Sequence, residues 1–343
     1  SQTFELETKD SGTAEAPILY RNYPGEKVSL SGGVDIDYSK FKPVDGEMKQ
    51  LLRNSGARDK VMVGDLDEIG IGPVPEIPIV EYATLKLPLF LFDGHVLKLS
   101  QWPNSDVQIA DWPVAGVINK GFCDRFPPGD PNNGTGQTKI SYTTDIPSSW
   151  SHNPSDILWF GYWRYEWYAE YFYGNLDKSA KTVEATKTLL YGAAPGLFPG
   201  GNQPFKVFNV YEEIDEPGEY YIDRSANKMY FYPYETTATK PVYKMTEKDF
   251  NLVSLKDTSY ITLRGIELTS GKKSGITISG GANNLIDQCD INAFEEMGAN
   301  IANGSKNGIS NSAVYNCGTG GVNLTGGDKD NIIAAGNFVY NTK

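Results

Sequence analysis

The residues whose type and spacing suggest catalysis are acidic side chains that recur at a constant interval along the chain. Glu267 and Asp290 are 23 positions apart, and Arg264 precedes Asp287 by the same 23 positions. If the chain repeats at that step, the members of each pair become neighbours on adjacent β-strands, about 4.8 Å apart. Two carboxylates that close suit glycoside hydrolysis, which needs one acid and one base or nucleophile. The alternative is a solvated acidic face that Arg264 balances.

The glycines of residues 251–343 show a repeat of that length. Three segments begin with glycine, at 275–281, 298–304 and 321–327, again at a step of 23. Each period contains short runs of alternating apolar residues broken by Gly, Asn and Ser, without the stripe of an amphipathic helix. A fixed period of this size indicates a solenoid, and strands of this type favour a parallel β-helix with coils of about 23 residues.

The same step predicts which side chains are stacked on one another in the coils. Asn284, Asn307 and Asp330 are expected to form a polar ladder at one turn, as side-chain amides do between stacked strands. Cys289 is expected to be a small buried hydrophobic residue and not a reactive thiol.

A second domain is expected between two parts of the helix. Residues 1–34 alternate like the later coils, and the repeat then resumes only at 251. The segment 35–250 is long enough to fold by itself and contains many short strands with turn signals, including hairpins around Asp93-Gly94 and 225–227. The sequence therefore predicts an all-β chain, a right-handed parallel β-helix interrupted by an inserted β-sandwich-like domain. The coils of 251–343 are expected to continue beyond the chain end.

Polar side chains in the turns are candidates for substrate binding. Glu295 and Glu296 are expected in the turn of one coil, and Asp328 and Lys329 in a later one. Turns on one face of a solenoid commonly build its binding groove, and these groups would hydrogen-bond to sugar hydroxyls. Trp163, in the aromatic run of the insert, could stack on a sugar or fill the core of the insert.

Composition narrows the possible partners. The net charge is −12. Nucleic acid and anionic membrane surfaces attract basic proteins, so neither is an expected partner. No run of about 18 apolar residues is present, so membrane insertion is not expected. The 2 histidines and 3 cysteines exclude a histidine-rich metal site and a zinc motif. No cofactor is expected, apart from calcium held by acidic turns.

Several short segments of the sequence are similar to segments of a known group of proteins. They are Gln101–Asn104, the aromatic run 159–167, Glu213–Arg224 and the Gly-Gly-Asp of 326–328. On these segments the chain resembles bacterial β-helix carbohydrate-active proteins with an inserted β-sandwich, and specifically glycoside hydrolase family 141, which contains fucosidases and xylanases. The resemblance implies a secreted or cell-surface bacterial protein that acts on plant or microbial polysaccharide. It also implies catalytic carboxylates in later coils, beyond Lys343.

Three functions are compatible with these observations. The first is a glycoside hydrolase with paired acids on the helix. The second is a polysaccharide lyase, which must neutralise a uronate carboxylate with Lys, Arg or a bound cation, and the absence of a basic cluster in the sequence is unfavourable to it. The third is a non-catalytic carbohydrate-binding module or adhesin. All three have a polysaccharide or oligosaccharide as partner, and the fold by itself does not separate them.

Overall fold

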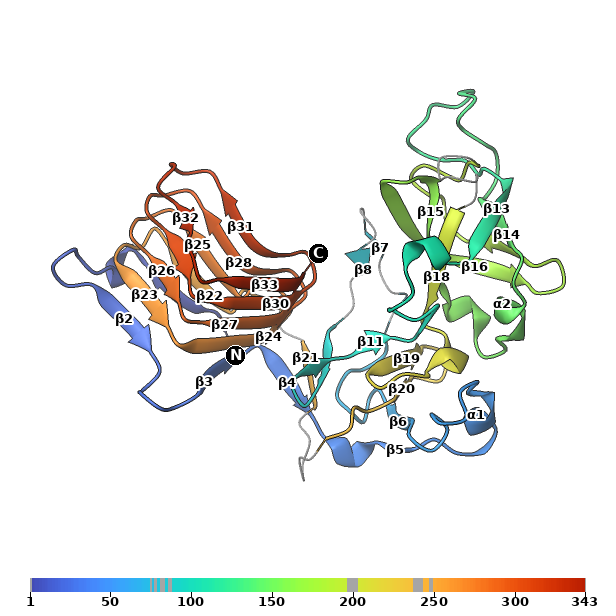
Figure 1. Cartoon of the computed structure of the whole chain (residues 1–343), viewed down its shortest axis with the longest axis horizontal. Helices are drawn as coiled ribbons and strands as arrows, with labels where there is room; N and C mark the ends of the chain where they lie inside the picture. The colour runs from blue at the N-terminus through green and yellow to red at the C-terminus, as the bar shows by residue number, and fades with distance from the viewer. Residues whose placement is uncertain are drawn as a thin grey trace. The chain divides into compact units, whose positions relative to one another are not determined.

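The computed structural model is almost entirely β-structure (Figure 1). It describes residues 2–74, 76, 79–80, 84–85, 88–195, 203–236, 243–246 and 249–342. The chain divides into two compact units, each built from segments far apart in the sequence. The first unit consists of residues 1–36, 87–96 and 240–343, and the second of residues 37–86 and 97–239.

The first unit contains a parallel β-helix made of three five-stranded parallel sheets. The first sheet has the order β1 (Phe4–Glu7), β22 (Val253–Lys256), β25 (Ile276–Ser279), β28 (Met297–Ala302), β31 (Gly320–Thr325). The second has the order β2 (Ile18–Arg21), β23 (Ile261–Arg264), β26 (Leu285–Asp287), β29 (Gly308–Ser310), β32 (Ile332–Ile333). The third has the order β3 (Val28–Ser31), β24 (Ile266–Gly271), β27 (Asp290–Phe294), β30 (Ala313–Cys317), β33 (Phe338–Thr342).

The repeat of 23 residues corresponds to one coil of this helix, as the glycines predict. A Cβ on Gly275 would lie 2.6 Å from the carbonyl oxygen of Gly298, and one on Gly298 would lie 2.8 Å from that of Gly321. The three glycines are therefore stacked in one column. The N-terminal strands form the first coil, since Phe4 pairs in parallel with Val253, some 250 positions later.

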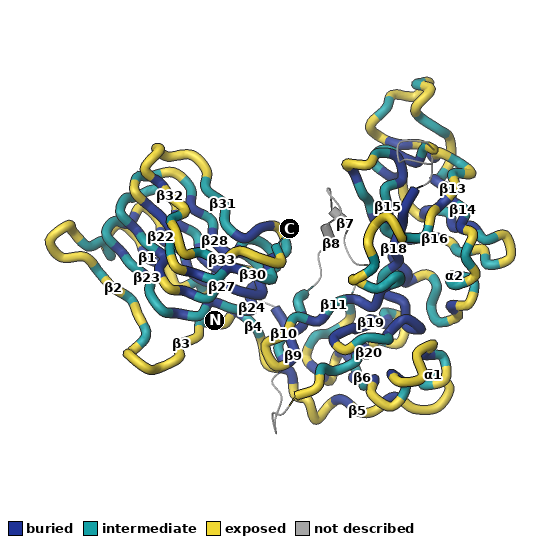
Figure 2. Tube along the Cα trace, in the orientation of Figure 1, coloured by how far each residue is buried: buried dark blue, intermediate teal, exposed yellow. Residues whose placement is uncertain are grey.

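Apolar side chains fill the helix because every second residue of a strand points inward. Leu255, Ile278 and Ile301 form one such inward column and are at most 1% exposed. Figure 2 shows the buried residues along the strands and the exposed ones in the turns. Cys289 is also buried, at 3% exposure, and the prediction that it is a core residue is confirmed.

The predicted polar ladder is present, with a different third member. The backbone N–H and the side-chain amide of Asn284 both donate to Oδ1 of Asn307, at 3.1 and 2.9 Å. The backbone N–H of Asn307 donates to Asn331 Oδ1 at 2.9 Å, so the prediction of Asp330 is wrong by one position. The last coil is longer than the others: Gly308 pairs with Ile332, a step of 24.

A small antiparallel sheet belongs to the first unit as well. Its order is β10 (His95–Val96), β9 (Phe90–Phe92), β21 (Tyr243–Thr246), β4 (Gly33–Ile36). The hairpin predicted around Asp93-Gly94 is formed by β9 and β10. Because this hairpin pairs through β21 with β4, which directly follows the first coil, residues 87–96 group with the helix although they lie within the segment 35–250.

The second unit contains a closed β-barrel, where a sandwich was expected. Its sheet has the order β12 (Gln101–Trp102), β18 (Gln203–Phe208), β13 (Val114–Asn119), β14 (Lys139–Tyr142), β17 (Thr182–Ala185), β16 (Tyr168–Asp177), β15 (Leu158–Tyr165). β18 pairs with β13 through one part of its length and with β15 through another, so the sheet closes on itself. Buried aromatic side chains fill the barrel, among them those of Trp150, Trp159, Phe172 and Phe205.

A second sheet of this unit has its own core around Tyr211, Tyr221 and Tyr230. Its order is β11 (Lys98–Leu99), β19 (Glu219–Asp223), β20 (Lys228–Phe231), β6 (Met62–Asp65), β5 (Lys42–Pro43), and β19 and β20 form the hairpin predicted around 225–227. The remaining elements are short: α1 (Gly46–Leu51), α2 (Ile146–Ser149), η1 (Thr8–Asp10), η2 (Tyr38–Lys40), η3 (Ile109–Asp111), η4 (Pro154–Asp156), η5 (Tyr211–Glu213), and the paired β7 (Ile79–Val80) and β8 (Thr84–Leu85). No helix in the described part of the chain is long and apolar enough to span a membrane.

Candidate functional site

A cleft of about 600 Å³ lies in the first unit, over the outward face of the third sheet of the helix. Its floor comes from β3, β24, β27 and β30, and further lining residues come from the β9–β10 hairpin and from β21. The lining residues are Lys27, Ser29, Ser31, Leu91, Asp93, Gly94, His95, Lys244, Glu267, Thr269, Ser270, Asn292 and Tyr315. All of them belong to the same compact unit.

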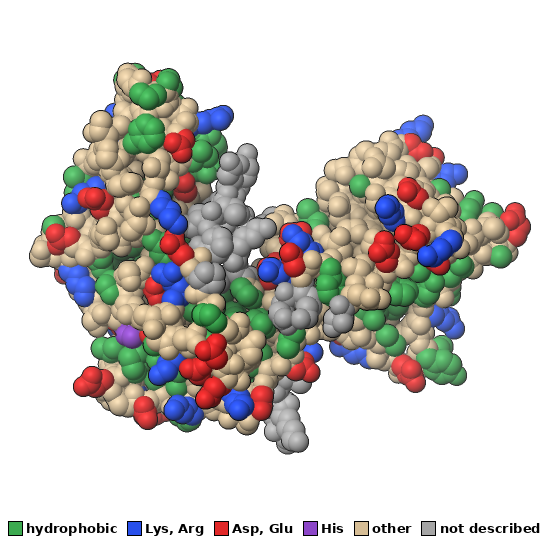
Figure 3. Space-filling model, turned by 180° about the vertical axis from the view of Figure 1, so that it is seen from behind, with side chains coloured by type: hydrophobic (Ala, Val, Ile, Leu, Met, Phe, Trp, Pro, Cys, Tyr) green, Lys and Arg blue, Asp and Glu red, His purple; other side chains and the backbone are tan. Residues whose placement is uncertain are grey.

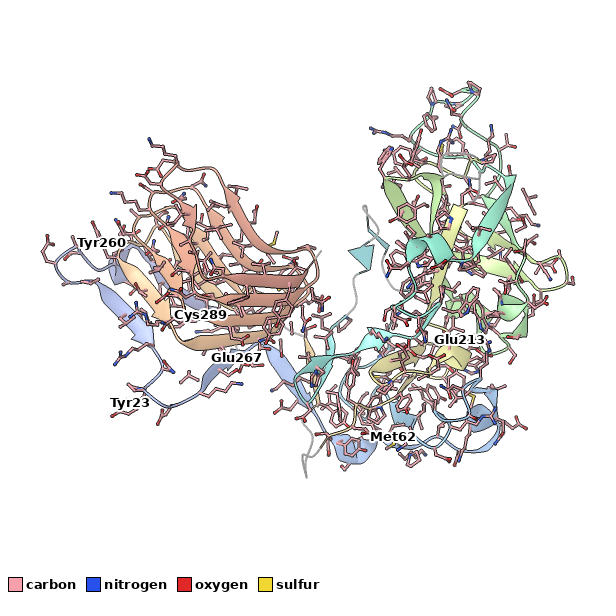
Figure 4. The ribbon with its side chains drawn as sticks, in the orientation of Figure 1. Tyr23, Met62, Glu213, Tyr260, Glu267 and Cys289 are labelled. Carbon is pink, nitrogen blue, oxygen red and sulfur yellow. The ribbon has the colours of Figure 1, made fainter. Side chains whose placement is uncertain are left out.

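Glu267 and Asp290 are paired in register on β24 and β27, as their spacing predicts. Both point outward, because the residues that follow them, Leu268 and Ile291, are fully buried in the core. Glu267 lines the cleft and also an adjoining hollow of about 340 Å³, which Asp290 lines too. The two carboxylates therefore lie on adjacent coils where the two hollows meet; Figure 4 marks Glu267 on this sheet.

A hydrogen-bond network orients the carboxylate of Asp290. The side-chain amide of Asn292 donates to Asp290 Oδ1 at 2.8 Å, and Thr269 Oγ1 donates to Asn292 Oδ1, also at 2.8 Å. The hydroxyl of Tyr315 is hydrogen-bonded to Asp290 as well. Burial and the adjacent Asp290 charge raise the pKa of Tyr315, so the phenol keeps its proton and donates it in this bond.

The next outward column of the same sheet presents flat aromatic rings. Residues two positions after the acidic pair share its face, because side chains of a strand alternate. Thr269, Asn292, Tyr315 and Tyr340 are in register in this column. The rings of Tyr315 and Tyr340 are stacked with centroids 4.8 Å apart and an interplanar angle of 5°. Each ring therefore covers one face of its partner, which leaves the edges and the outer faces of the pair for a ligand.

Two cations lie at this cleft, each beside a carboxylate. Lys27 Nζ is 3.3 Å from Glu267, and the Lys27 side chain is 79% exposed, so it can leave that contact at little cost. Lys244 Nζ is 2.5 Å from Asp35. The hollow around the acidic pair thus contains acids, amides, hydroxyls and lysines, the groups that hydrogen-bond to carbohydrate hydroxyls.

Comparison with known proteins bears on the fold of this unit. Residues 251–343 match the family model described as "Right handed beta helix region". A solved structure named "Glycoside hydrolase" is similar to the chain with a TM-score of 0.59 and 13% sequence identity. The similarity covers 92% of this chain and 57% of that structure, so the chain spans little more than half its length. At this identity the likeness shows the fold alone. No curated protein matches significantly.

The turn residues predicted to bind substrate lie outside this cleft. Glu295 accepts a hydrogen bond from the hydroxyl of Thr246, and Glu296 forms an ion pair with Lys273 at 2.8 Å. That ion pair raises the pKa of Lys273. These contacts connect neighbouring segments of the first unit, so the two glutamates have structural partners.

Asp328 and Lys329 lie in the exposed turn after β31. Hydrogen bonds from Ser305 and from the backbone of Asp330 lower the pKa of Asp328. Its carboxylate thus accepts hydrogen bonds from its own turn and from the turn of the preceding coil. Neither residue lines the cleft around Glu267.

Trp163 is a core residue of the barrel. Its side chain is 2% exposed, its ring packs against Phe172 and Phe205, and Nε1 donates to the backbone carbonyl of Glu170 at 2.8 Å. A covered indole offers no face to a sugar. Of the two interpretations of Trp163, the structure supports the core and removes it from the candidate sugar contacts.

Several residues of the cleft were not predicted from the sequence. Tyr315, Asn292 and Thr269 could have been found from the period-two alternation, since they lie two positions along from the outward acidic column. His95 and Lys244 line the cleft from an antiparallel sheet. The sequence of that sheet has no repeat, so the pattern of the chain did not predict these two residues.

Proposed function

We propose that the protein is a glycoside hydrolase whose paired carboxylates are Glu267 and Asp290. The observation that carries this proposal is their register: adjacent strands bring the two side chains to one outward face beside a cleft of about 600 Å³. The right-handed β-helix and the similarity to a structure named "Glycoside hydrolase" are consistent with it. Secretion and a polysaccharide substrate are parts of the same proposal.

The surroundings of the two acids suggest different roles. Asp290 is held by the Asn292 amide and the Tyr315 hydroxyl, which orient a carboxylate that acts as base or nucleophile. Glu267 lines both hollows, beside the exposed Lys27, so it is the group that reaches a bound glycosidic oxygen as acid.

A polysaccharide lyase is the second candidate, because Lys27 and Lys244 border the same cleft and could neutralise a uronate carboxylate. A lyase also needs a base to remove the C5 proton. Tyr315 is positioned near the acids, but its raised pKa keeps it protonated and therefore a donor. The register of the two carboxylates, which hydrolysis requires and elimination does not, favours hydrolysis.

The test is substitution of each acid, Glu267→Gln and Asp290→Asn, assayed on neutral polysaccharides and on polygalacturonate. We expect reducing-end release to fall by about 10²–10⁴-fold, the usual contribution of a catalytic acid or base. The control is Glu5→Gln, which removes an outward carboxylate from β1 on another sheet and should leave the rate unchanged.

Two outcomes would contradict the proposal. Products that absorb in the ultraviolet would indicate an unsaturated sugar and hence a lyase. Full hydrolytic activity in both variants would make the pair structural and place the catalytic acids elsewhere in the protein.

A further inference from the structure

A second hollow, of about 500 Å³, lies in the second unit and is separate from the cleft around Glu267. Two of the sequence segments singled out above contribute to it, Gln101–Asn104 and the start of Glu213–Arg224. They are more than 100 positions apart in the sequence, yet Trp102, Asn104, Glu213 and Asp215 all line the same space. The hydrolase proposal assigns no role to it.

Trp102 supplies a fixed aromatic surface in this hollow. Its ring packs edge-to-face on the buried Trp150, with centroids 5.9 Å apart and an interplanar angle of 72°. The indole is half-buried against the barrel core and lines the hollow with the remainder. Because the ring is already fixed in one orientation, a ligand that stacks on it loses less free energy to ordering the side chain.

Carboxylates and an amide surround the ring. Asn104 Nδ2 lies 3.1 Å from Asp215 Oδ1 and 3.1 Å from Glu216 Oε1, so it holds both acids in place. Glu213 is 3% exposed, and its Oε1 accepts hydrogen bonds from Trp150 Nε1 at 2.6 Å and from Arg53. Within the described part of the chain no donor is bonded to the other oxygen, Oε2, although Glu213 lines the hollow (labelled in Figure 4). Oε2 is not among the buried oxygens that lack a partner, so it is an accessible acceptor that a ligand hydroxyl can reach.

The charge of the hollow limits which ligands it can take. The described residues that line it include four carboxylates and one cation, Arg53, with the acids being Asp106, Glu213, Asp215 and Glu216. An anionic sugar would be repelled. No group of three or more acidic, histidine or cysteine side chains among the described residues is arranged to hold a metal ion. On the face seen in Figure 3, acidic and basic side chains are interspersed over the surface.

We propose that this hollow is a second carbohydrate-binding site, which takes a neutral sugar ring. Trp102 stacks on the ring, and the carboxylates of Glu213 and Asp215 accept hydrogen bonds from its hydroxyls. A stacked ring with carboxylate acceptors beside it discriminates sugars by the positions of their hydroxyls. The site rests on the proposed action on carbohydrate but not on the chemistry at Glu267, since it needs no reaction to bind.

The experiment is native affinity electrophoresis of the protein in gels that contain xylan, xyloglucan, galactomannan or polygalacturonate. We expect at least one neutral polysaccharide to retard the protein. Trp102→Ala and Asp215→Ala should each weaken that retardation by about tenfold or more, as truncation of central binding residues usually does. Trp102→Phe keeps a flat ring and should give an intermediate value.

The matched control is Trp167→Ala, which removes an indole of the same unit that is 64% exposed and lies outside the hollow. This variant should migrate like the unmodified protein, whereas Glu267→Gln, in the proposed active site, should keep the part of the retardation that Trp102→Ala removes. Retardation that survives in Glu267→Gln while hydrolysis is lost separates this site from the proposed active site. If circular dichroism shows Trp102→Ala to be unfolded, Asp215→Ala decides.

The proposal is overturned by any of three results: no neutral polysaccharide retards the protein, polygalacturonate alone does so, or the folded Trp102 and Asp215 variants bind like the unmodified protein. Loss of binding in Trp167→Ala with retention in Trp102→Ala would move the site to the exposed aromatic rings of the barrel.

Discussion

At the scale of single residues, burial separates the acidic side chains into two kinds. The acids of the proposed active site face solvent, whereas Glu219 in the second unit is fully buried. Its Oε2 accepts hydrogen bonds from the backbone N–H groups of Asp215 and Glu216, and its Oε1 has no hydrogen-bond partner among the residues that the structure describes. Burial raises the pKa of Glu219 to about 8 and that of Glu170 to about 7.

These raised pKa values predict a pH dependence of stability. Between the ordinary value of 4.5 and about 8, the folded state holds a proton on Glu219 that the unfolded state has released. Stability therefore falls as the pH rises through that window, by at most about 1.4 kcal/mol per unit of pKa difference. Glu219→Gln cannot ionise and should flatten the decline.

The measurement is the thermal unfolding midpoint of the second unit at pH 5, 6.5 and 8. Lys42→Gln, on the exposed β5 of the same sheet, serves as the control and should keep the slope of the unmodified protein. A midpoint that rises from pH 5 to pH 8, or a slope that Glu219→Gln leaves unchanged, would show that Glu219 is ionised in the folded protein.

At the scale of elements, the coils of the helix are held in register by side-chain ladders as well as by strand pairing. Asn307 is fully buried, and its Oδ1 accepts both hydrogen bonds from Asn284. Its own Nδ2 donates to the backbone carbonyl of Gly280 at 3.1 Å. The Asn307 side chain thereby forms hydrogen bonds with buried polar groups of the preceding coil, which water cannot reach.

Asn307→Ala should destabilise the helix by about 2–4 kcal/mol, because two buried donors of Asn284 then lose their acceptor. Asn323→Ala is the matched control, since Asn323 forms a similar ladder bond to Asn300 at 2.8 Å on the partly exposed outward face. We expect about 1 kcal/mol or less for it. Urea denaturation measures both, and equal losses would mean that burial of the ladder does not matter.

At the scale of the whole molecule, each unit has a core of its own. The helix core contains Leu255, Ile278 and Ile301, and the barrel core contains Trp159 and Phe205. Units with separate cores commonly unfold as separate cooperative transitions.

Calorimetry should therefore resolve two transitions. Asn307→Ala is expected to lower the temperature of one, and Glu219→Gln to change the pH dependence of the other. A single transition that both substitutions move by similar amounts would show that the two units unfold together.

The sequence by itself determined the helix and the neighbours within it. Alternation fixes which side chains of a strand point inward, and a constant step of 23 fixes which residues of successive coils are adjacent, so local information translates directly into long-range contacts. That is why the Glu267–Asp290 pair, the Arg264–Asp287 ion pair at 2.8 Å and the burial of Cys289 were all predictable.

Only the tertiary structure decided the rest. Closure of the barrel depends on β18 pairing with two distant strands, and no period in the sequence specifies such antiparallel pairs. That closure is what buries Trp163. The cleft likewise needs His95 and Lys244, which a non-repeating sheet brings beside the acidic column. The last coil has 24 residues where the earlier ones have 23, so the asparagine ladder ends on Asn331 and not on Asp330. The hydrogen bonds between strands set the register of that coil, and a constant step in the sequence does not.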